Sequence, residues 1–313
     1  MAGIYPATPE NIRRAAETIK SGGLAAFPTE TVYGLGASVY NPRAVARIFQ
    51  VKGRPTFNPL ISHIADIDFL PEYAQTDSRV MALARRFMPG PLTLVLNRTD
   101  SNPALDLACA GLRTITVRMP NHPVALDLIR AAGMPVVAPS ANASTTISPT
   151  TAQHVFDSLG EGVDMILDGG ACPVGLESTI IDITGKQAVL LRSGFITRAE
   201  LEAFLNEPVI VSAGNPDAPK SPGQMLRHYA PQKPLRLNAA TPAADEFHIG
   251  FGAVPGALNL SPQGDLAEAA AHLFAYLRQA DAQRDCPKIA IAPIPSLGLG
   301  EAINDRLTRA AHK

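Results

Sequence analysis

Apolar residues recur along the chain in two periods, which predict helices and strands in regular succession. A first helix is predicted over residues 8–22, where apolar residues repeat at intervals of three and four, and an apolar strand at 24–27 follows it. The same patterns predict helices at 41–50, 78–88, 124–131, 152–159 and 197–205, and strands at 59–63, 92–96, 114–118, 135–138, 165–167, 179–183 and 188–191. Such alternation is typical of an α/β domain with a mixed sheet.

The alternation stops at residues 206–234, where Pro, Gly and polar residues predominate. A stretch of this length is unusual as a loop inside a compact domain, so we predict a linker between a domain at 1–205 and a second at 235–313. Beyond the linker, strand patterns at 235–237, 246–251, 257–260 and 288–292, with helix patterns at 265–280 and 302–311, predict a small Rossmann-like α/β domain.

Composition narrows the class of protein. The 313 residues are enough for two domains, each with its own core, and the formal net charge of -1 argues against a dedicated nucleic-acid binder. The three cysteines stand far apart with no CxxC pair, which excludes a zinc ribbon or a disulfide framework. Because the sequence shows neither a signal peptide nor an apolar run of 18 residues, we expect a soluble, cytoplasmic protein without a membrane partner.

Positive charge is concentrated in the stretch that follows the first strand. Residues 31–65 contain no acidic side chain but include Arg43, Arg47, Lys52 and Arg54. Gly53 and Pro55 end the predicted helix abruptly, which would direct the cations Lys52 and Arg54 out of one turn. This pattern indicates a site for a small anion. The alternative is that both cations only offset the C-terminal dipole of the helix.

Two more stretches without acidic residues accompany predicted strands. Residues 138–156 carry no charge but many hydroxyls, directly after the buried strand at 135–138, while residues 111–122 place Arg118 at the end of a strand. Ligands commonly bind at the carboxyl ends of strands in α/β sheets, and hydroxyls with loop amides suit phosphate or ribose oxygens. Arg118 could clamp a carboxylate or phosphate in a bidentate manner. The alternatives are a Ser/Thr-rich turn and a surface arginine.

Familiar catalytic motifs are absent. The sequence has no GxxxxGK[ST] motif, and Gly34-Leu35-Gly36 lacks the third glycine of a dinucleotide fingerprint. It has no GxSxG or HExxH motif either, so covalent and zinc catalysis are unsupported. His63 is the histidine most strongly indicated for a role, because it closes the basic stretch.

Seven motifs in unbroken order resemble the YrdC family of L-threonylcarbamoyladenylate synthases over residues 10–205. They are FPTETVYGLGA, KGRPTFNPL, PGPLTLVL, VRMPNHPVALDLI, APSANAS followed by SPT, ESTIIDIT and LRSG. SPGQMLRHYAP and GLGEAINDRLTRAA are similar to the linker and the C-terminal domain of the longer members. The resemblance implies a YrdC-like domain with a twisted mixed sheet and flanking helices.

The resemblance also implies a reaction, that of a nucleotidyltransferase. ATP, L-threonine and bicarbonate or carbon dioxide would give threonylcarbamoyl-AMP and pyrophosphate, with magnesium as cofactor. The metal would be bound mainly by the ATP phosphates rather than by a metal site of the protein. A downstream transferase would move the threonylcarbamoyl group to a tRNA adenosine, and a weak direct contact with tRNA is compatible with the resemblance.

Motif positions imply the site residues. Those for L-threonine are Thr31, His63, Arg118, the backbone at Ala138, and Ser178. Those for ATP are Lys52, Arg54, Asn58, Thr114, Ser140, Asn142, Ser148, Arg192 and Tyr229. Lys52, Arg54 and Arg118 are expected to act in catalysis by positioning and charge neutralisation. Tyr229 matches a residue that reaches over the nucleotide, so the linker is expected to serve as a lid.

Two positions depart from the family pattern. Thr145 stands where the family commonly has glycine after the serine of the SAN loop, and Leu226 replaces the first tyrosine of YRHYAP.

The sequence leaves two alternative functions open. One is a double-stranded RNA-binding module, which a concave basic surface would suit. The other is a carbamoyltransferase of the hydrogenase-maturation type, against which the lack of a CxxC pair counts.

Overall fold

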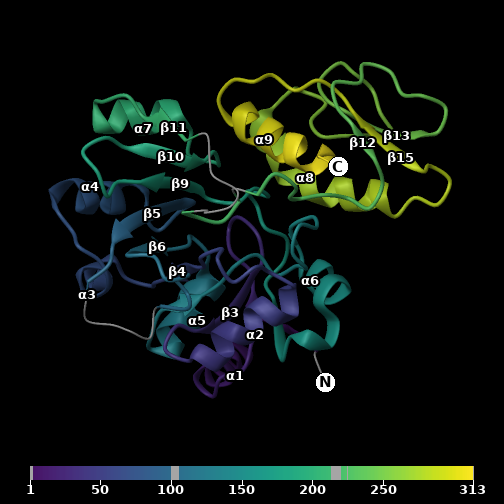
Figure 1. Ribbon diagram of the computed structural model, residues 1–313. Coiled ribbons are helices and arrows are strands. Elements are labelled where there is room, and N and C mark those ends of the chain that lie inside the picture. Colours follow the sequence, from purple (N-terminus) through teal and green to yellow (C-terminus); the bar gives the residue numbers. More distant parts are fainter. Residues whose placement is uncertain (1–2, 100–105, 213–219, 224, 313) are drawn as a thin grey trace.

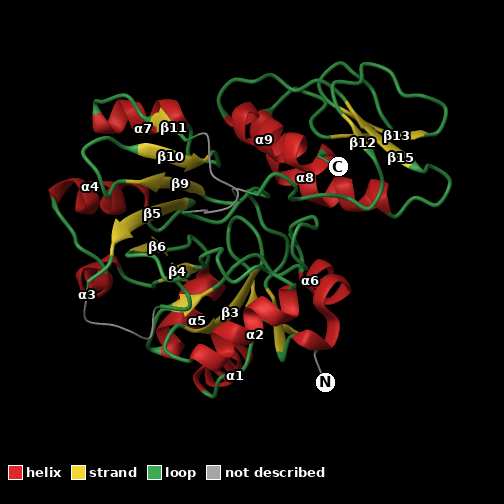
Figure 2. Ribbon diagram, viewed as in Figure 1, coloured by secondary structure: helices red, strands yellow, loops and turns green. Residues whose placement is uncertain are grey.

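The computed structural model describes residues 3–99, 106–212, 220–223 and 225–312, which form a large and a small α/β part (Figure 1 and Figure 2). Residues 213–219 and 224 of the predicted linker therefore lie outside the described residues. The helices of the large part are α1 (Pro9–Lys20), α2 (Pro42–Lys52), α3 (Leu70–Tyr73), α4 (Ser78–Phe87), α5 (Pro123–Ala132), α6 (Ala152–Leu159) and α7 (Arg198–Leu205), with short 3-10 helices at Ile67–Phe69 and Gly160–Gly162.

The described strands of the large part form one mixed sheet in the order β1-β8-β2-β3-β7-β4-β6-β5-β9-β10-β11. Their bounds are β1 (Ile4–Pro6), β2 (Ala25–Phe27), β3 (Gly34–Ser38), β4 (Ile61–His63), β5 (Leu92–Asn97), β6 (Thr114–Arg118), β7 (Val136–Val137), β8 (Met165–Asp168), β9 (Thr179–Asp182), β10 (Val189–Arg192) and β11 (Ile210–Val211). Buried side chains of α1 and α5 cover one face of this sheet, and those of α2, α4, α6 and α7 pack on the other. The predicted α/β fold with a mixed sheet is confirmed.

The small part is a parallel sheet in the order β12-β15-β13-β14, with two helices. Its elements are β12 (Leu235–Arg236), β13 (Glu246–Gly250), β14 (Leu258–Asn259), α8 (Leu266–Asp281), β15 (Lys288–Ile291) and α9 (Leu299–Ala311). Both helices lie on the side of this sheet that faces the large part (Figure 1). Val32, Ile147 and Leu176 of the large part belong to the same apolar cluster as the α8 and α9 side chains, so the small part is packed onto the large one.

Three strands had no counterpart in the sequence prediction. We interpreted the chain after residue 27 as a turn leading to a helix, but β3 intervenes and pairs antiparallel with both β2 and β7. Its sequence, GLGAS, is buried throughout and shows no alternation. Gly36 is required there because an added Cβ would lie 2.8 Å from the Phe27 ring. β11 lies within the predicted linker and extends the large sheet by pairing with β10, while β1 is a three-residue strand that pairs with β8.

The basic stretch adopts the predicted helix and turn. The Asn41 side chain caps α2 by accepting hydrogen bonds from the backbone of Arg43 and Ala44, both at 3.1 Å. Gly53 ends the helix in the left-handed region, with φ 59°. The chain therefore leaves α2 between Lys52 and Arg54, whose side chains are both buried.

Of the helices in the described part of the chain, none has both the length and the apolar character needed to cross a membrane.

Candidate functional site

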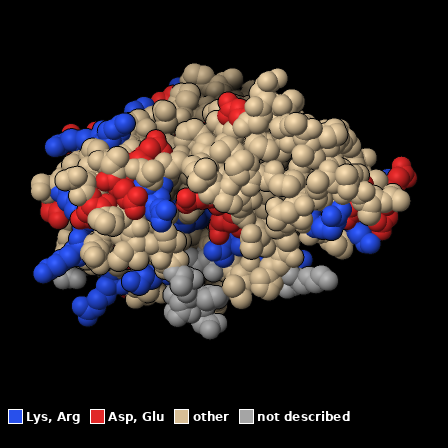
Figure 3. Space-filling model, turned by 90° about the horizontal axis from the view of Figure 1, so that it is seen from above, with Lys and Arg blue, Asp and Glu red and all other residues tan. Residues whose placement is uncertain are grey.

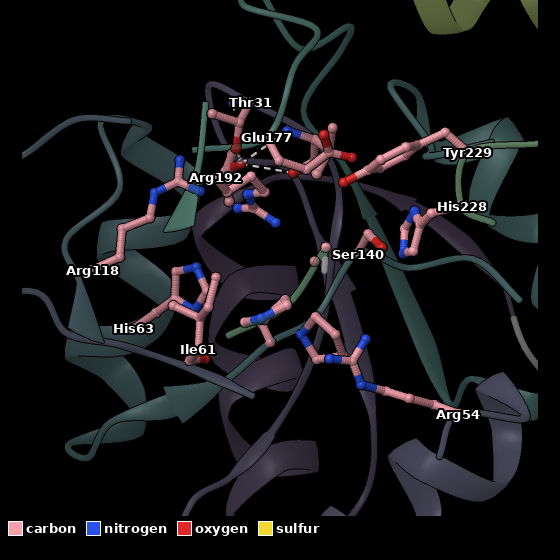
Figure 4. A pocket seen from close by; sticks show the side chains of 17 residues that line it. Thr31, Arg54, Ile61, His63, Arg118, Ser140, Glu177, Arg192, His228 and Tyr229 are labelled. Carbon is pink, nitrogen blue, oxygen red and sulfur yellow. Dashed lines mark hydrogen bonds between the residues drawn. The ribbon is translucent and has the colours of Figure 1, made fainter. Parts of the chain in front are cut away.

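A cavity opens where the large sheet meets the chain segment that leads into the small part. Eight predicted site residues line it: Thr31, Arg54, His63, Arg118, Ala138, Ser140, Arg192 and Tyr229. His63 and Arg118 lie on one side, Arg54, His228 and Tyr229 on the other, and Arg192 and Ser140 between them (Figure 4). The cavity encloses about 40 Å³, which is room for roughly three waters and far below the ~300–1,000 Å³ of typical ligand sites.

Three guanidinium groups face this cavity against one lining carboxylate, that of Glu177. Arg54 donates to the carbonyls of Asn58 at 3.3 Å and Pro59 at 2.9 Å. Arg192 donates to the carbonyl and the hydroxyl of Ser178, both at 3.0 Å. Because Arg54 is buried and near Arg192, its pKa is lowered to about 9, which marks a site with excess positive charge. The arrangement suits a polyanion.

Arg118 is the third guanidinium and the only one of them with a carboxylate within ion-pair distance among the described residues. Its Nη2 lies 2.7 Å from Oε2 of Glu30, and both side chains are buried. Its Nε donates to the carbonyl of Gly90 at 3.3 Å. Glu30 directly precedes the predicted residue Thr31 in the FPTET motif but was not itself assigned, because its pairing with Arg118 depends on the fold. The pair fixes the guanidinium at the end of β6, beside His63 of β4.

His63 is a neutral member of the site. Burial and the nearby Arg118 lower its pKa to about 3, and its Nδ1 lies 3.2 Å from the carbonyl oxygen of Ile61. Its ring also meets the edge of Phe27, with centroids 6.4 Å apart. At neutral pH the imidazole can therefore donate or accept a hydrogen bond without adding charge.

We expect this histidine to make folding stability depend on pH in acid. The unfolded chain binds the proton below about pH 6.5, whereas the folded chain binds it only near pH 3, so stability falls as pH is lowered from 6.5 towards 3 and does not depend on this group above pH 6.5. Between pH 6 and 4, His63→Gln should reduce the slope of the unfolding free energy against pH by up to about 1.4 kcal/mol per pH unit. Urea titrations at a series of pH values measure this slope in both proteins. Identical slopes in the two proteins would contradict this protonation state.

Lys52 does not line the cavity. Its ammonium donates to the carbonyl of Ser140 at 2.6 Å and to that of Asn142, so it joins the end of α2 to the SAN loop. Burial and the proximity of Arg54 lower its pKa well below the usual value. The Asn142 side chain donates to the Thr146 carbonyl at 2.9 Å. Both residues thus shape the loop that carries Ser140.

The remaining predicted residues do not line the cavity. The Ser148 hydroxyl donates to Glu177 at 2.5 Å, and the Ser178 hydroxyl lies 2.7 Å from that of Thr93. Asn58 is buried and its side-chain amide has no hydrogen-bond partner among the described residues. Thr114 opens β6 and is paired with Asn97, four residues and about 13 Å from Arg118 along the strand.

Residues 222–223 and 225–230, the covering segment, lie over the cavity on the side of the small part. The Tyr229 ring is buried, stacks on Phe274 of α8 at 5.6 Å between centroids, and lies 3.9 Å from the His228 ring. Gly223, at φ +88°, lies so close to Arg192 that an added Cβ would be 2.8 Å from the Arg192 side chain. Burial and several neighbouring cations, Arg54 first among them, lower the pKa of His228 well below its usual value. The covering segment thus fits closely against the guanidinium cluster.

The two departures from the family pattern have structural explanations. Thr145 has φ 69°, the left-handed region that glycine adopts more readily, and its carbonyl accepts a hydrogen bond from Ala230 at 2.8 Å. The SAN loop therefore keeps a glycine-like conformation and pairs with the covering segment. Leu226 is 56% exposed, so the change from tyrosine falls on the surface of that segment.

The described residues contain no group of three or more His, Cys, Asp or Glu side chains placed to hold a metal ion. The two carboxylates nearest the cavity are already engaged, Glu30 by Arg118 and Glu177 by Ser148 and Arg306.

Besides Glu30, the sequence analysis left Glu177 and Arg306 unassigned. Glu177 is the first residue of the ESTIIDIT motif and was not assigned to the site, although it lies on the cavity wall. Arg306 lies in a predicted helix, where an arginine is most often on the surface, yet it is 1% exposed and forms an ion pair with Glu177 at 2.9 Å. No local pattern distinguishes such a residue from its exposed neighbours.

Comparison with known proteins gives a consistent result. Residues 17–194 match the family described as "Telomere recombination", and residues 196–312 match "Threonylcarbamoyl-AMP synthase, C-terminal domain". The chain is 39% identical to the threonylcarbamoyl-AMP synthase of Bacillus subtilis, covering 96% of this chain and 92% of that protein. It is 47% identical to that of Pyrococcus abyssi over 70% of this chain and 65% of that protein. The crystal structure of P. abyssi Sua5 complexed with L-threonine superposes with a TM-score of 0.89 and 36% identity, covering 99% of this chain and 97% of that one.

Proposed function

The chain belongs to the threonylcarbamoyl-AMP synthase family, and we propose that it catalyses the reaction of that family at the cavity described above. The substrates would be L-threonine, carbon dioxide or bicarbonate, and ATP, and the products threonylcarbamoyl-AMP and pyrophosphate. The observation that carries the proposal is the placement of three guanidinium groups around one cavity, with a neutral histidine beside one of them. A triphosphate and an amino-acid carboxylate are both anions that such groups bind.

The two sides of the cavity suit different substrates. His63 and Arg118 lie at the carboxyl ends of the parallel strands β4 and β6, with Thr31 and the Ala138 backbone nearby, and we assign this side to L-threonine. The P. abyssi relative was crystallised with L-threonine, which supports threonine as a ligand of this site. Arg118 would bind the threonine carboxylate, while the neutral His63 and the hydroxyl of Thr31 offer hydrogen bonds without charge.

The opposite side is assigned to ATP. Arg54 and Arg192 would contact phosphate oxygens, Ser140 would meet the ribose or phosphates, and Tyr229 would cover the nucleotide. Lys52 and Asn142 contribute indirectly, by holding the Ser140 loop. Magnesium would arrive bound to the ATP phosphates.

The proposed chemistry needs positioning and charge neutralisation rather than a covalent intermediate. The threonine amine attacks the carbon of carbon dioxide and loses a proton to solvent, which gives an N-carbamate. A carbamate oxygen then attacks the α-phosphorus of ATP in line while the bond to pyrophosphate breaks. Arg118 fixes the nucleophile at the end of β6, and Arg54 and Arg192 stabilise the negative charge that builds up on the leaving pyrophosphate.

Access to the cavity requires movement. A volume of about 40 Å³ admits neither substrate, and the covering segment contributes Pro222, Gly223, His228 and Tyr229 to the cavity lining. We therefore propose that this segment opens to admit ATP and closes on it, so that water is excluded during the reaction.

The product would pass to a transferase that modifies a tRNA adenosine, and we place both steps in the cytoplasm. Acidic and basic side chains are mixed on the face shown in Figure 3, which gives the RNA-binding alternative no support there.

The decisive experiment is an assay of pyrophosphate release from ATP. We expect release that requires both L-threonine and bicarbonate, with serine a much poorer substrate, because a cavity of this kind discriminates by close contact with the threonine side chain. Release that does not depend on threonine would overturn the proposed function. RNA affinity that is strong at physiological salt, together with no turnover, would instead favour the RNA-binding alternative.

A further inference from the structure

Arg306 of α9 reaches from the small part into the wall of the cavity. It is 1% exposed, and its Nε lies 2.9 Å from Oε2 of Glu177. Its other nitrogens donate to the Ser193 carbonyl at 2.9 Å and to Asp305 at 2.7 Å. Its Cζ lies 5.0 Å from the centroid of the Tyr229 ring. One side chain thus contacts both the cavity wall and the segment that covers it.

Glu177 links Arg306 to Ser148, one of the residues predicted to bind ATP. One of its carboxylate oxygens pairs with Arg306, and the other accepts the hydrogen bond from Ser148, whose hydroxyl is fully buried. The next residue, Ser178, is held separately by Arg192 and Thr93. Loss of the Arg306 contact should therefore disturb Glu177, Ser148 and Tyr229 more than it disturbs Ser178.

The loop that carries Glu177 is held closely against the small part. Gly175 has φ +72°, and an added Cβ there would be 2.5 Å from the Ala270 carbonyl oxygen of α8. Leu176 is fully buried in the apolar cluster that includes the α8 and α9 side chains. α9 also binds the covering segment, because Arg309 donates to the Met225 carbonyl at 2.6 Å and accepts from the His228 backbone through its own carbonyl at 3.3 Å.

A buried ion pair by itself is weak evidence for a gain in stability, since apolar residues of similar volume often serve as well. The choice of arginine has a geometric explanation here. A planar guanidinium can contact Glu177, Ser193 and Asp305 at once and still present its face to Tyr229, which a lysine ammonium cannot do.

We propose that Arg306 is a positioning residue for the ATP side of the site, through which the small C-terminal part aligns Glu177 with Ser148 and Tyr229 with the nucleotide. The inference rests on the proposed function and gives the C-terminal part a role in it. The small part then supports the wall of the active site from behind, through Glu177 and Tyr229.

The test compares Arg306→Lys with the wild-type full-length chain in the pyrophosphate-release assay. Lysine keeps the positive charge opposite Glu177, so the fold is retained. It lacks the planar guanidinium, however, and with it the several fixed N–H donors and the contact with the face of the Tyr229 ring. We expect KM for ATP to rise about 10-fold while KM for L-threonine stays within two-fold. Arg236→Lys is the matched control: Arg236 is in the same part and pairs with Glu246 at 2.6 Å, but it is 49% exposed. We expect it to behave as wild type.

A second variant addresses folding. Arg306→Met combined with Glu177→Gln leaves no unpaired charge buried, yet it also lacks the contacts that align Ser148 and Tyr229, so KM for ATP should rise as in Arg306→Lys. An unchanged KM for ATP in Arg306→Lys, or equal increases in KM for both substrates, would refute the positioning role. If wild type itself shows no threonine-dependent release, the proposed function fails, and titration of both proteins with a non-hydrolysable ATP analogue still tests Arg306: equal affinities would refute it.

Discussion

Arg118→Gln is expected to lower kcat/KM for L-threonine by about 10- to 100-fold and to destabilise the fold at the same time. The loss in activity follows from removing one charge-assisted contact to the substrate carboxylate, worth roughly 1.5–3 kcal/mol. The loss in stability arises because the Glu30 side chain is only 6% exposed and would lose the Arg118 guanidinium, whose Nη2 lies 2.7 Å from its Oε2. Breaking a buried pair in this way costs about 3–5 kcal/mol. Steady-state kinetics and urea unfolding measure the two effects.

A double variant separates the two effects. Glu30→Gln combined with Arg118→Gln removes both charges, so most of the lost stability should return, while kcat/KM for L-threonine should stay as low as in Arg118→Gln. Arg130→Gln is the control, since Arg130 pairs with Asp127 on the surface at 3.2 Å and its loss should change stability by less than about 0.5 kcal/mol. If activity recovered together with stability in the double variant, Arg118 would be a structural residue only.

The elements of this fold that could be predicted are those with a strong local signal. Helix α2 is an example, because Asn41 and Gly53 mark its two ends by cap chemistry and its apolar residues recur at helical spacing. Strand β3 carries no such signal: its GLGAS sequence is buried on all sides, so neither alternation nor propensity marks it. It is a strand because β2 and β7 flank it and supply its hydrogen bonds.

The candidate site shows the same division. Motif position led to residues that do line the cavity, such as His63, Arg118 and Arg192. It also assigned Lys52 to the ATP, whereas the ammonium donates to two loop carbonyls. The difference lies in side-chain direction, because a motif gives the residue type at a position and tertiary packing decides what that side chain contacts.

Contacts between distant segments were outside the reach of sequence reasoning. Glu30 and Arg118 are far apart in sequence, as are Glu177 and Arg306, and each pair meets only after the sheet and the two parts have assembled. Arg306 belongs to an amphipathic helix in which Arg309 is only partly buried, so spacing alone does not show which arginine points inward. These pairs nevertheless set the electrostatics of the cavity, since they neutralise the two carboxylates nearest to it.

Removal of the small C-terminal part should abolish most of the activity while leaving the large part folded. The structure places the cut after Ser212 rather than after Leu205, because β11 pairs with β10 and the Ser212 amide donates to the Leu190 carbonyl at 2.9 Å. Fragment 1–212 keeps the guanidinium cluster but loses Tyr229 and Arg306.

The loss of two contacts, one to Tyr229 and one to Arg306, amounts to roughly 3–4 kcal/mol, so we expect kcat/KM for ATP to fall about 100- to 1,000-fold. The fragment should melt cooperatively by circular dichroism but bind apolar dyes, because Val32, Ile147 and Leu176 lose the side chains that bury them in the complete chain. The full-length Arg236→Lys protein serves as the active reference. A fragment that releases pyrophosphate within two-fold of the full-length rate would show that the small part is dispensable. That result would refute both the role of the covering segment and the positioning role of Arg306.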